Sequence, residues 1–357
     1  MSSRWGTGAS GSSPTPALRS TPANPPAPAD APPLAEVAEA LAARGPGDWR
    51  PSEPVWLSSF RIHERKVASY RHGRVFLAGD AAHVHSPAGG QGMNTGMQDA
   101  YNLAWKIALV ENDLARAEPL LASYHDERSP VGEQVLARAT AMTKLATLRH
   151  PLAQQIRNRL VPLIASLDAV QHRLEDQFTE LAIAYPRSPI QGEHRGFSAG
   201  SWLLGGGVAP GERAPDAALR VGETGRPSAL FEVLRGTSHV LLLLEGSAEA
   251  AAASSLPAIG TRVRERYGHL VSQHLVVSPG RSEARPDWPG AILGDPTGEL
   301  HERYAATAPT LYLIRPDGYV GYRSQPADEG RLLEHLERYL IPRDTADRRG
   351  VRHTEDP

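Results

Sequence analysis

The segment from residue 78 to residue 100, AGDAAHVHSPAGGQGMNTGMQDA, places one acidic residue after an apolar run and several glycines ahead of a helical pattern. The apolar run at 75–78 predicts a buried strand, so Asp80 would lie where the carboxyl end of a strand opens into a ligand-binding crevice. A carboxylate there can accept two hydrogen bonds from sugar-like hydroxyls, and glycines let backbone N–H groups approach a flat ring. A helix beginning near Gly92 would point its positive end at the ligand. The segment therefore predicts a ligand with hydroxyl groups and an anionic ring edge.

Other interpretations of these residues stay open. Asp80 alone is more often a helix cap or turn residue, and His83 with His85 is compatible with an ordinary polar pair in a loop. The three side chains together would suit a metal ion, but no further ligand spacing in the sequence supports such a site. Reduced flavin fits the whole segment, because it carries ribityl hydroxyls and a negative charge near its N1 and O2 atoms, which a helix amino terminus stabilises.

The same residues resemble a known family. Residues 73–83 (GRVFLAGDAAH), followed by Pro87, 89–94 (GGQGMN) and 99–106 (DAYNLAWK), look like the second flavin motif of the single-component FAD-dependent aromatic hydroxylases. Residues 121–131 (LASYHDERSPV) resemble the helix that follows this motif. The cysteine-free carboxyl-terminal part resembles the third domain of the phenol hydroxylase branch. The resemblance covers about residues 34–342.

The resemblance implies FAD as cofactor, NAD(P)H as co-substrate and hydroxylation of an aromatic or polyketide small molecule. It implies that Asp80 binds the ribityl chain, that Pro87 lines the flavin and substrate side, and that the backbone of 90–94 meets the pyrimidine edge. No catalytic acid or base and no metal ligand follow from it. The implied cofactor-binding residues are Gly79, Asp80, Pro87, Gly89, Gly90, Gln91, Gly92, Met93 and Asn94.

The sequence departs from the family at its amino-terminal side. Family members begin with a glycine-rich strand–turn–helix for the ADP half of FAD, and residues 6–11 (GTGASG) match that pattern only in letters. Too few residues precede them for a central strand, and Pro14 and Pro16 block the helix. We therefore expect a truncated or split form, with a homodimer or a separate chain supplying the missing half. The alternative function is a non-catalytic remnant or association subunit with a structural thioredoxin-like domain.

The chain predicts an α/β fold in which a partial FAD-binding domain with a helical extension precedes a thioredoxin-like domain. The expected division is a disordered tail at 1–33, the partial FAD-binding monooxygenase domain at 34–185, a linker at 186–210, the thioredoxin-like domain at 211–342 and a tail at 343–357. The fold of the last domain usually carries a cis proline before its hairpin, which would here be Pro309.

Periodicity predicts the elements of both parts. The apolar side chains of the helix after the motif recur on one face and read as core; they are Met93, Met97, Ala100, Tyr101, Ala104 and Ile107. Expected helices cover 34–43, 114–127, 130–148 and 152–184, with breaks at Pro130 and Pro151. A strand is expected at 55–62. The carboxyl-terminal part should hold strands at 239–244, 270–277, 310–314 and 319–323 and helices at 248–267, 299–305 and 329–340.

Composition narrows the function classes. A net charge of -2 over 357 residues gives no broad attraction to nucleic acid or to an anionic membrane. The absence of cysteine excludes disulfides, thiolate metal sites and dithiol redox chemistry. No apolar stretch approaches the length of a membrane span, and the amino terminus lacks the apolar core of a secretory signal. We therefore expect a cytoplasmic protein.

Overall fold

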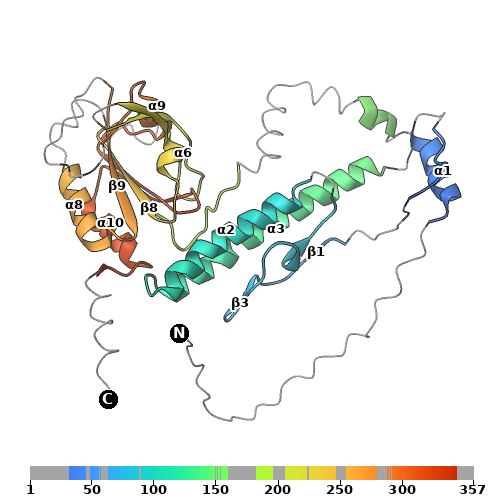
Figure 1. Ribbon diagram of the computed structural model, residues 1–357, viewed down its shortest axis with the longest axis horizontal. Helices are drawn as coiled ribbons and strands as arrows, with labels where there is room; N and C mark the ends of the chain where they lie inside the picture. Colours follow the sequence, from blue (N-terminus) through green and yellow to red (C-terminus); the bar gives the residue numbers. More distant parts are fainter. Residues whose placement is uncertain are drawn as a thin grey trace, which may run out of the picture. The chain divides into compact units, whose positions relative to one another are not determined.

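A computed structural model describes the chain at 32–45, 49–55, 57, 63–87, 90–148, 150, 152, 154–159, 182–195, 206–222, 225–246, 255–279, 288, 290 and 292–343 (Figure 1). The chain divides into two units, residues 1–62 and 63–357. In the first unit, helix α1 (Leu34–Arg44) confirms the helix expected at 34–43. Nearly all of both predicted tails, most of the strand predicted at 55–62 and most of the helix predicted at 152–184 lie outside the described residues.

The second unit contains an eight-stranded mixed sheet. Its strands, in the order in which they pair, are β5 (Gly192–Arg195), β12 (Val320–Gln325), β11 (Thr310–Ile314), β8 (His239–Leu244), β9 (Val271–Val277), β10 (Ile292–Gly294), β6 (Ala218–Val221) and β7 (Arg226–Ala229). Strands β8, β9 and β10 are parallel, and β11 is antiparallel to both of its neighbours. The sequence HVLLLL of β8 has no polar face, which suits a strand buried on both sides.

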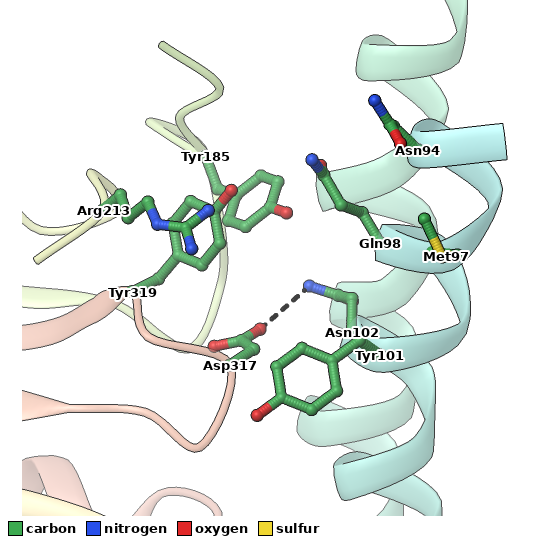
Figure 2. Close-up of a pocket in the computed structure, with 9 residues that line it drawn as sticks. All are labelled: Asn94, Met97, Gln98, Tyr101, Asn102, Tyr185, Arg213, Asp317 and Tyr319. Atoms are coloured by element: carbon green, nitrogen blue, oxygen red, sulfur yellow. Dashed lines mark hydrogen bonds between the residues drawn. The ribbon is translucent and has the colours of Figure 1, made fainter. Parts of the chain in front are cut away.

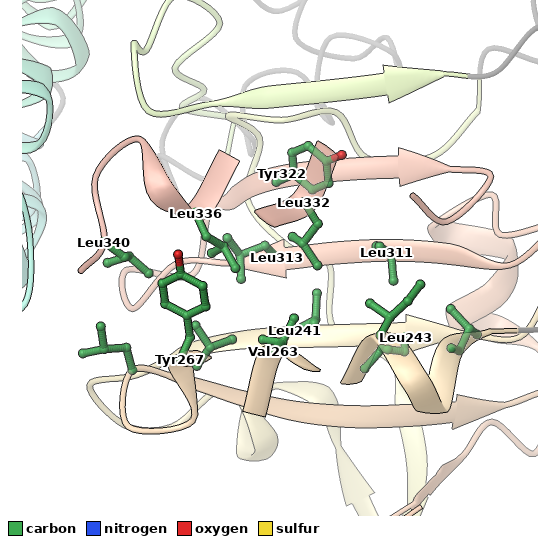
Figure 3. Close-up of a cluster of buried hydrophobic side chains, with 14 of the residues drawn as sticks. Leu241, Leu243, Val263, Tyr267, Leu311, Leu313, Tyr322, Leu332, Leu336 and Leu340 are labelled. Atoms are coloured by element: carbon green, nitrogen blue, oxygen red, sulfur yellow. The ribbon is translucent and has the colours of Figure 1, made fainter. Parts of the chain in front are cut away.

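Helices cover the sheet on both faces. Leu241 and Leu243 of β8 pack in one cluster with α8 (Leu256–Tyr267) and α10 (Glu329–Glu337), which Figure 3 shows. The alternate residue Leu242 belongs to a second cluster that includes side chains of the short helices α6 (Leu230–Val233) and α9 (Glu299–Arg303). Burial of both faces of one central strand makes this sheet the main core of the unit.

The element order of this part confirms the prediction of strand, helix, strand, helix, hairpin and helix. Strands β5, β6, β7 and β10 were not predicted, and β5 lies inside the segment expected to be a linker, where it pairs with β12. The cis assignment of Pro309 is wrong, because the cis peptide bond of the described chain joins Gln325 to Pro326. The thioredoxin-like assignment stays a prediction.

The segment before the flavin-type motif forms small antiparallel pairs. Strand β1 (Arg65–Lys66) pairs with β4 (His83–Val84), and β2 (Arg71–His72) pairs with β3 (Val75–Phe76). The prediction of a buried strand at 75–78 is therefore wrong for the described chain: β3 covers two residues, has one partner strand, and leaves 63% of Val75 exposed. A hydrophobic run can form a buried strand only where other elements cover both of its faces.

Helices α2 (Gly92–Glu111) and α3 (Ala117–Ala146) lie side by side in Figure 1. The start of α2 confirms the helix expected near Gly92. The break predicted at Pro130 is wrong, because α3 continues through it. Side chains on both sides of Pro130, such as Arg128 and Val131, are buried, and this packing offsets the roughly 3 kcal/mol that an interior proline costs.

In α2, the face that was predicted to be buried is exposed, and a mostly polar face is buried instead. Met93, Met97 and Tyr101 are 74%, 57% and 54% exposed. The buried side chains of this helix are instead Thr95, Asp99, Asn102, Trp105 and Lys106. The prediction that the Met and aromatic face forms core is therefore wrong, and the polar face that is buried needs partners. No helix in the described part of the chain is long and apolar enough to cross a membrane.

Candidate functional site

Asp80 is exposed on the 3₁₀ helix η1 (Gly79–Ala81). Its carboxylate makes no hydrogen bond or ion pair with any described residue. The preceding Gly79 has φ +58°, a left-handed conformation that favours glycine, and a Cβ there would lie 3.5 Å from the Cα of Gly96 in α2. The close approach of two glycines thus fixes η1 on α2, and the Asp80 carboxylate remains free to accept hydrogen bonds from a ligand.

Asp99 of α2 holds this segment in place. Its Oδ2 accepts hydrogen bonds from the Gly79 N–H at 3.0 Å and from His83 Nε2 at 2.9 Å, and its Oδ1 accepts one from Arg128 Nε at 2.6 Å. Burial alone would raise the pKa of Asp99, but these hydrogen bonds and the Arg128 charge hold it below its ordinary value. Asp99 is therefore a buried carboxylate that positions the backbone beside Asp80.

The two histidines of the motif are structural in this arrangement. His83 is buried and gives its Nε2 proton to Asp99, which leaves that nitrogen unable to bind a metal ion. The His85 ring stacks on it at 6.4 Å, with Nδ1 2.8 Å from the Ser86 carbonyl oxygen. No group of three metal-ligating side chains occurs among the described residues. The metal interpretation of Asp80, His83 and His85 gains no support.

The remaining predicted residues surround the amino terminus of α2. Gly90 has φ +65°, its N–H donates to the Pro87 carbonyl at 3.0 Å, and the space around its absent Cβ is open. Gln91 is buried, whereas Pro87, Met93 and Asn94 are exposed; Gly89 lies outside the described residues. The first turn of α2 carries no acidic residue and no side-chain cap, so its positive end is not neutralised there.

A buried charge cluster joins α2 and α3 to the β11–β12 turn, and sequence analysis missed it. Glu127 of α3 accepts hydrogen bonds from Lys106 Nζ at 2.8 Å and from Arg315 at 2.6 and 2.9 Å. Asp317 accepts hydrogen bonds from Arg315, from Asn102 Nδ2 at 3.2 Å and from Trp105 Nε1 at 3.1 Å. The partners that bury the polar face of α2 therefore come mainly from residues far away in the sequence.

The pKa values in this cluster follow from its geometry. Burial alone would raise the pKa of Glu127, but the charges and hydrogen bonds of Arg315 and Lys106 hold it well below its ordinary value. Burial lowers the pKa of Lys106 to about 8, although Glu127 opposes that change. Glu127 accepts hydrogen bonds from Lys106 and Arg315, and Lys106 also donates to Asn102, so these residues form a structural joint and offer no free acid or base.

A pocket of about 320 Å³ opens beside this joint (Figure 2). Its α2 side consists of Asn94, Met97, Gln98, Tyr101 and Asn102, and its other side consists of Tyr185, Arg213, Asp317 and Tyr319. Only Asn94 belongs to the predicted flavin-binding set. The spacing of Asn94, Gln98 and Tyr101 on a helix could have indicated that their side chains share a face, but not what lies opposite.

Comparison with known proteins gives two family matches. The family described as FAD binding domain matches residues 29–139, and the family described as aromatic-ring hydroxylase, C-terminal, matches residues 208–341. The first matched region contains the Asp80 segment and the joint residues of α2 and α3. The second contains the strands of the eight-stranded sheet from β6 onward.

Individual relatives agree with these matches. A 6-methylpretetramide 4-monooxygenase of Streptomyces rimosus is 37% identical over 300 residues, which are 83% of this chain and 50% of that protein. A pentachlorophenol 4-monooxygenase of Sphingobium chlorophenolicum is 34% identical over 286 residues, 79% of this chain and 48% of that protein. The crystal structure of CabE, an aromatic hydroxylase from angucycline biosynthesis, matches with a TM-score of 0.58 and 35% identity, covering 86% of this chain and 53% of that one. The chain spans about half the length of the curated relatives it matches.

Proposed function

Because this chain belongs to the family of FAD-dependent aromatic-ring hydroxylases, we propose that it acts in an FAD-dependent monooxygenase that hydroxylates an aromatic or polyketide substrate with NAD(P)H and oxygen. Flavin, when bound and reduced, supplies the oxygen activation, and the protein supplies binding and orientation. The observation that carries the proposal is the free Asp80 carboxylate, held close to α2 by the contact between Gly79 and Gly96.

The residues present fit a flavin. The exposed Asp80 carboxylate would accept hydrogen bonds from the ribityl hydroxyls. The backbone from Gly90 to Asn94, with open space at Gly90 and no acidic side chain in the first turn, would meet the pyrimidine edge. The proposed cofactor-binding residues are those of the sequence prediction, Gly79, Asp80, Pro87, Gly89, Gly90, Gln91, Gly92, Met93 and Asn94. Asp99 is added as a positioning residue.

Flavin titration tests this proposal. Asp80→Ala should weaken flavin binding roughly ten- to a hundredfold, because hydrogen bonds to a charged group contribute about 1.5 to 3 kcal/mol. Gly92→Val should do comparable harm by blocking the backbone approach, and His85→Ala should change little. Asp126→Ala, an exposed carboxylate of α3, is the matched control. Equal flavin affinity in wild type, Asp80→Ala and Gly92→Val would contradict the assignment of this segment.

The exposed apolar side of α2 favours a second role, association with another chain. Met93, Ala100 and Ala104 are apolar side chains exposed on this helix, and none of them lines the pocket described above. We infer that this side packs either against a second copy of the chain or against a separate chain that carries the nucleotide-binding half. Met93→Lys should then lower the molar mass measured by light scattering, alone or with that chain. If Met93→Lys leaves the molar mass unchanged both for the chain alone and for its mixture with the separate chain, this association role is excluded.

We also propose the domain division at 34–185 and 211–342, with the second part thioredoxin-like and structural, since a chain without cysteine cannot exchange disulfides. Trp105 and Leu120 share one hydrophobic cluster with the sheet, and the Ile341 N–H donates to the Leu114 carbonyl at 2.9 Å. The two parts should therefore unfold together in a single calorimetric transition. Two separate transitions would leave the domain division in place and show that these contacts do not couple the unfolding of the two parts. A cytoplasmic location remains part of the proposal, to be tested by fractionation.

A further inference from the structure

The pocket beside α2 contains one cation without an internal partner. Arg213 is exposed, and its guanidinium forms no hydrogen bond or ion pair with any described residue. Its backbone is held firmly, because the flanking Glu212 and Ala214 exchange hydrogen bonds with Val320 and Gly318 at 2.9 Å each. The structure thus presents the Arg213 side chain from a fixed backbone position in the pocket wall, where its guanidinium can bind an anion.

The acidic residue of the pocket does not neutralise Arg213. Both carboxylate oxygens of Asp317 accept hydrogen bonds from Arg315, and one also accepts from Asn102 and Trp105. Asp317 is 7% exposed, and the charge of Arg315 balances its own. The net charge that the pocket offers to a ligand is therefore the positive charge of Arg213.

Three of the residues that line the pocket are tyrosines. The Tyr185 and Tyr319 rings lie 4.4 Å apart between centroids, and Arg315 lies 5.6 and 5.9 Å from those centroids. Tyr101 is tied to the turn by a hydrogen bond from its hydroxyl to the Pro316 carbonyl at 2.8 Å. Burial raises the pKa of Tyr101 and of Tyr319, so both phenols stay neutral. Neutral rings favour contact with a flat ligand.

We propose that this pocket is a second small-molecule site, which shares only Asn94 with the proposed flavin segment, and that it binds a flat aromatic ligand carrying a carboxylate. Arg213 receives the carboxylate, and the ligand ring lies between the tyrosine wall and the α2 side chains Met97 and Gln98 (Figure 2). The volume of about 320 Å³ is at the lower end of the range for small-molecule pockets, which suits a ligand of one or two fused rings.

Fluorescence titration of the full chain with 2-naphthoate, in the absence of flavin, tests the proposal. Wild type should bind it saturably, and Arg213→Gln should weaken binding about tenfold, as expected for loss of one charge-assisted contact. The neutral analogue 2-naphthamide should bind wild type and Arg213→Gln equally. Arg226→Gln, which changes an exposed arginine outside the pocket, should leave 2-naphthoate binding unchanged.

A second variant fills the pocket and leaves the charge of Arg213 in place. Met97→Trp changes an exposed side chain, so it should keep the thermal melting temperature while abolishing 2-naphthoate binding. Asp80→Ala should leave 2-naphthoate binding intact, which separates this site from the proposed flavin site. The proposal is overturned by absence of saturable binding to wild type, by equal affinity in Arg213→Gln, by an equal loss in Arg226→Gln, or by full binding in Met97→Trp.

Discussion

Arg315, in the turn after β11, donates two hydrogen bonds to Glu127 of α3, from Nη1 to Oε1 at 2.6 Å and from Nη2 to Oε2 at 2.9 Å. Both side chains are fully buried. The pair is separated by 188 positions in the sequence, so it connects the helices that follow the flavin-type motif to the carboxyl-terminal sheet. It is the central contact of the joint.

Glu127→Gln should destabilise the protein strongly. The substitution removes the negative charge between Arg315 and Lys106 and leaves two buried cations close together, a change that typically costs about 3 to 5 kcal/mol. Urea unfolding measures the loss. Glu133→Gln, on the same helix with an exposed side chain, is the control and should change the midpoint little. Equal midpoints for the two variants would show that the joint contributes nothing to stability.

Lys106→Met should be the milder change at the same joint. Glu127 then keeps both hydrogen bonds to Arg315, so no buried charge loses its only partner. The folded pKa of Lys106 is depressed to about 8, so between pH 8 and its ordinary pKa near 10.4 the unfolded chain binds more protons. Wild type should therefore gain stability relative to Lys106→Met as pH rises through this window. The urea midpoints of wild type and Lys106→Met, measured at pH 7.5 and pH 10, test this prediction. If the difference between the two proteins is the same at both pH values, the pKa of Lys106 is not depressed in the folded chain.

Acid should weaken the fold through its buried carboxylates. The pKa values of Asp99, Glu127 and Asp295 are all held below their ordinary values in the folded chain. The unfolded chain therefore binds more protons in acid, and the stability that these groups contribute is present above about pH 4 and is lost as pH falls. The free energy of unfolding should drop between pH 5 and pH 3. This drop in the free energy of unfolding should be smaller in Glu127→Gln. If wild type and Glu127→Gln lose the same free energy between pH 5 and pH 3, Glu127 does not contribute to the acid sensitivity.

Much of the sheet could be predicted because its signals are local. The run from His239 to Leu244 has no polar face, and Pro316, Asp317 and Gly318 form a recognisable turn, so β8 and the β11–β12 hairpin follow from sequence. The short strands β5 and β10 form by pairing with strands already in the sheet. With four and three residues, they are too short to show a hydrophobic pattern that would predict them.

The joint could not be predicted for a different reason. Hydropathy assigns Met97 and Tyr101 to a core and Asp99 and Lys106 to solvent, and the structure shows the opposite. Lys106 can be buried because it donates hydrogen bonds to Glu127 and Asn102, and the distant Arg315 keeps Glu127 ionised. A helical period contains no information about these partners. The glycines near Asp80 were informative because their conformation is set locally, as the positive φ values at Gly79 and Gly90 show.

Gly132→Ala should destabilise the protein despite its place inside a helix. Alanine usually favours a helix interior by about 1 kcal/mol over glycine, but here the new Cβ would lie 2.1 Å from the Tyr70 hydroxyl oxygen. Tyr70 is fully buried and its hydroxyl has no hydrogen-bond partner in the described structure, so Tyr70→Phe alone should be neutral or stabilising. The double variant should therefore recover most of the stability lost in Gly132→Ala, because the Cβ then faces a ring carbon 3.4 Å away. A thermal-melting cycle of the four proteins measures this coupling, and strictly additive effects would show that Tyr70 does not pack against Gly132 as described.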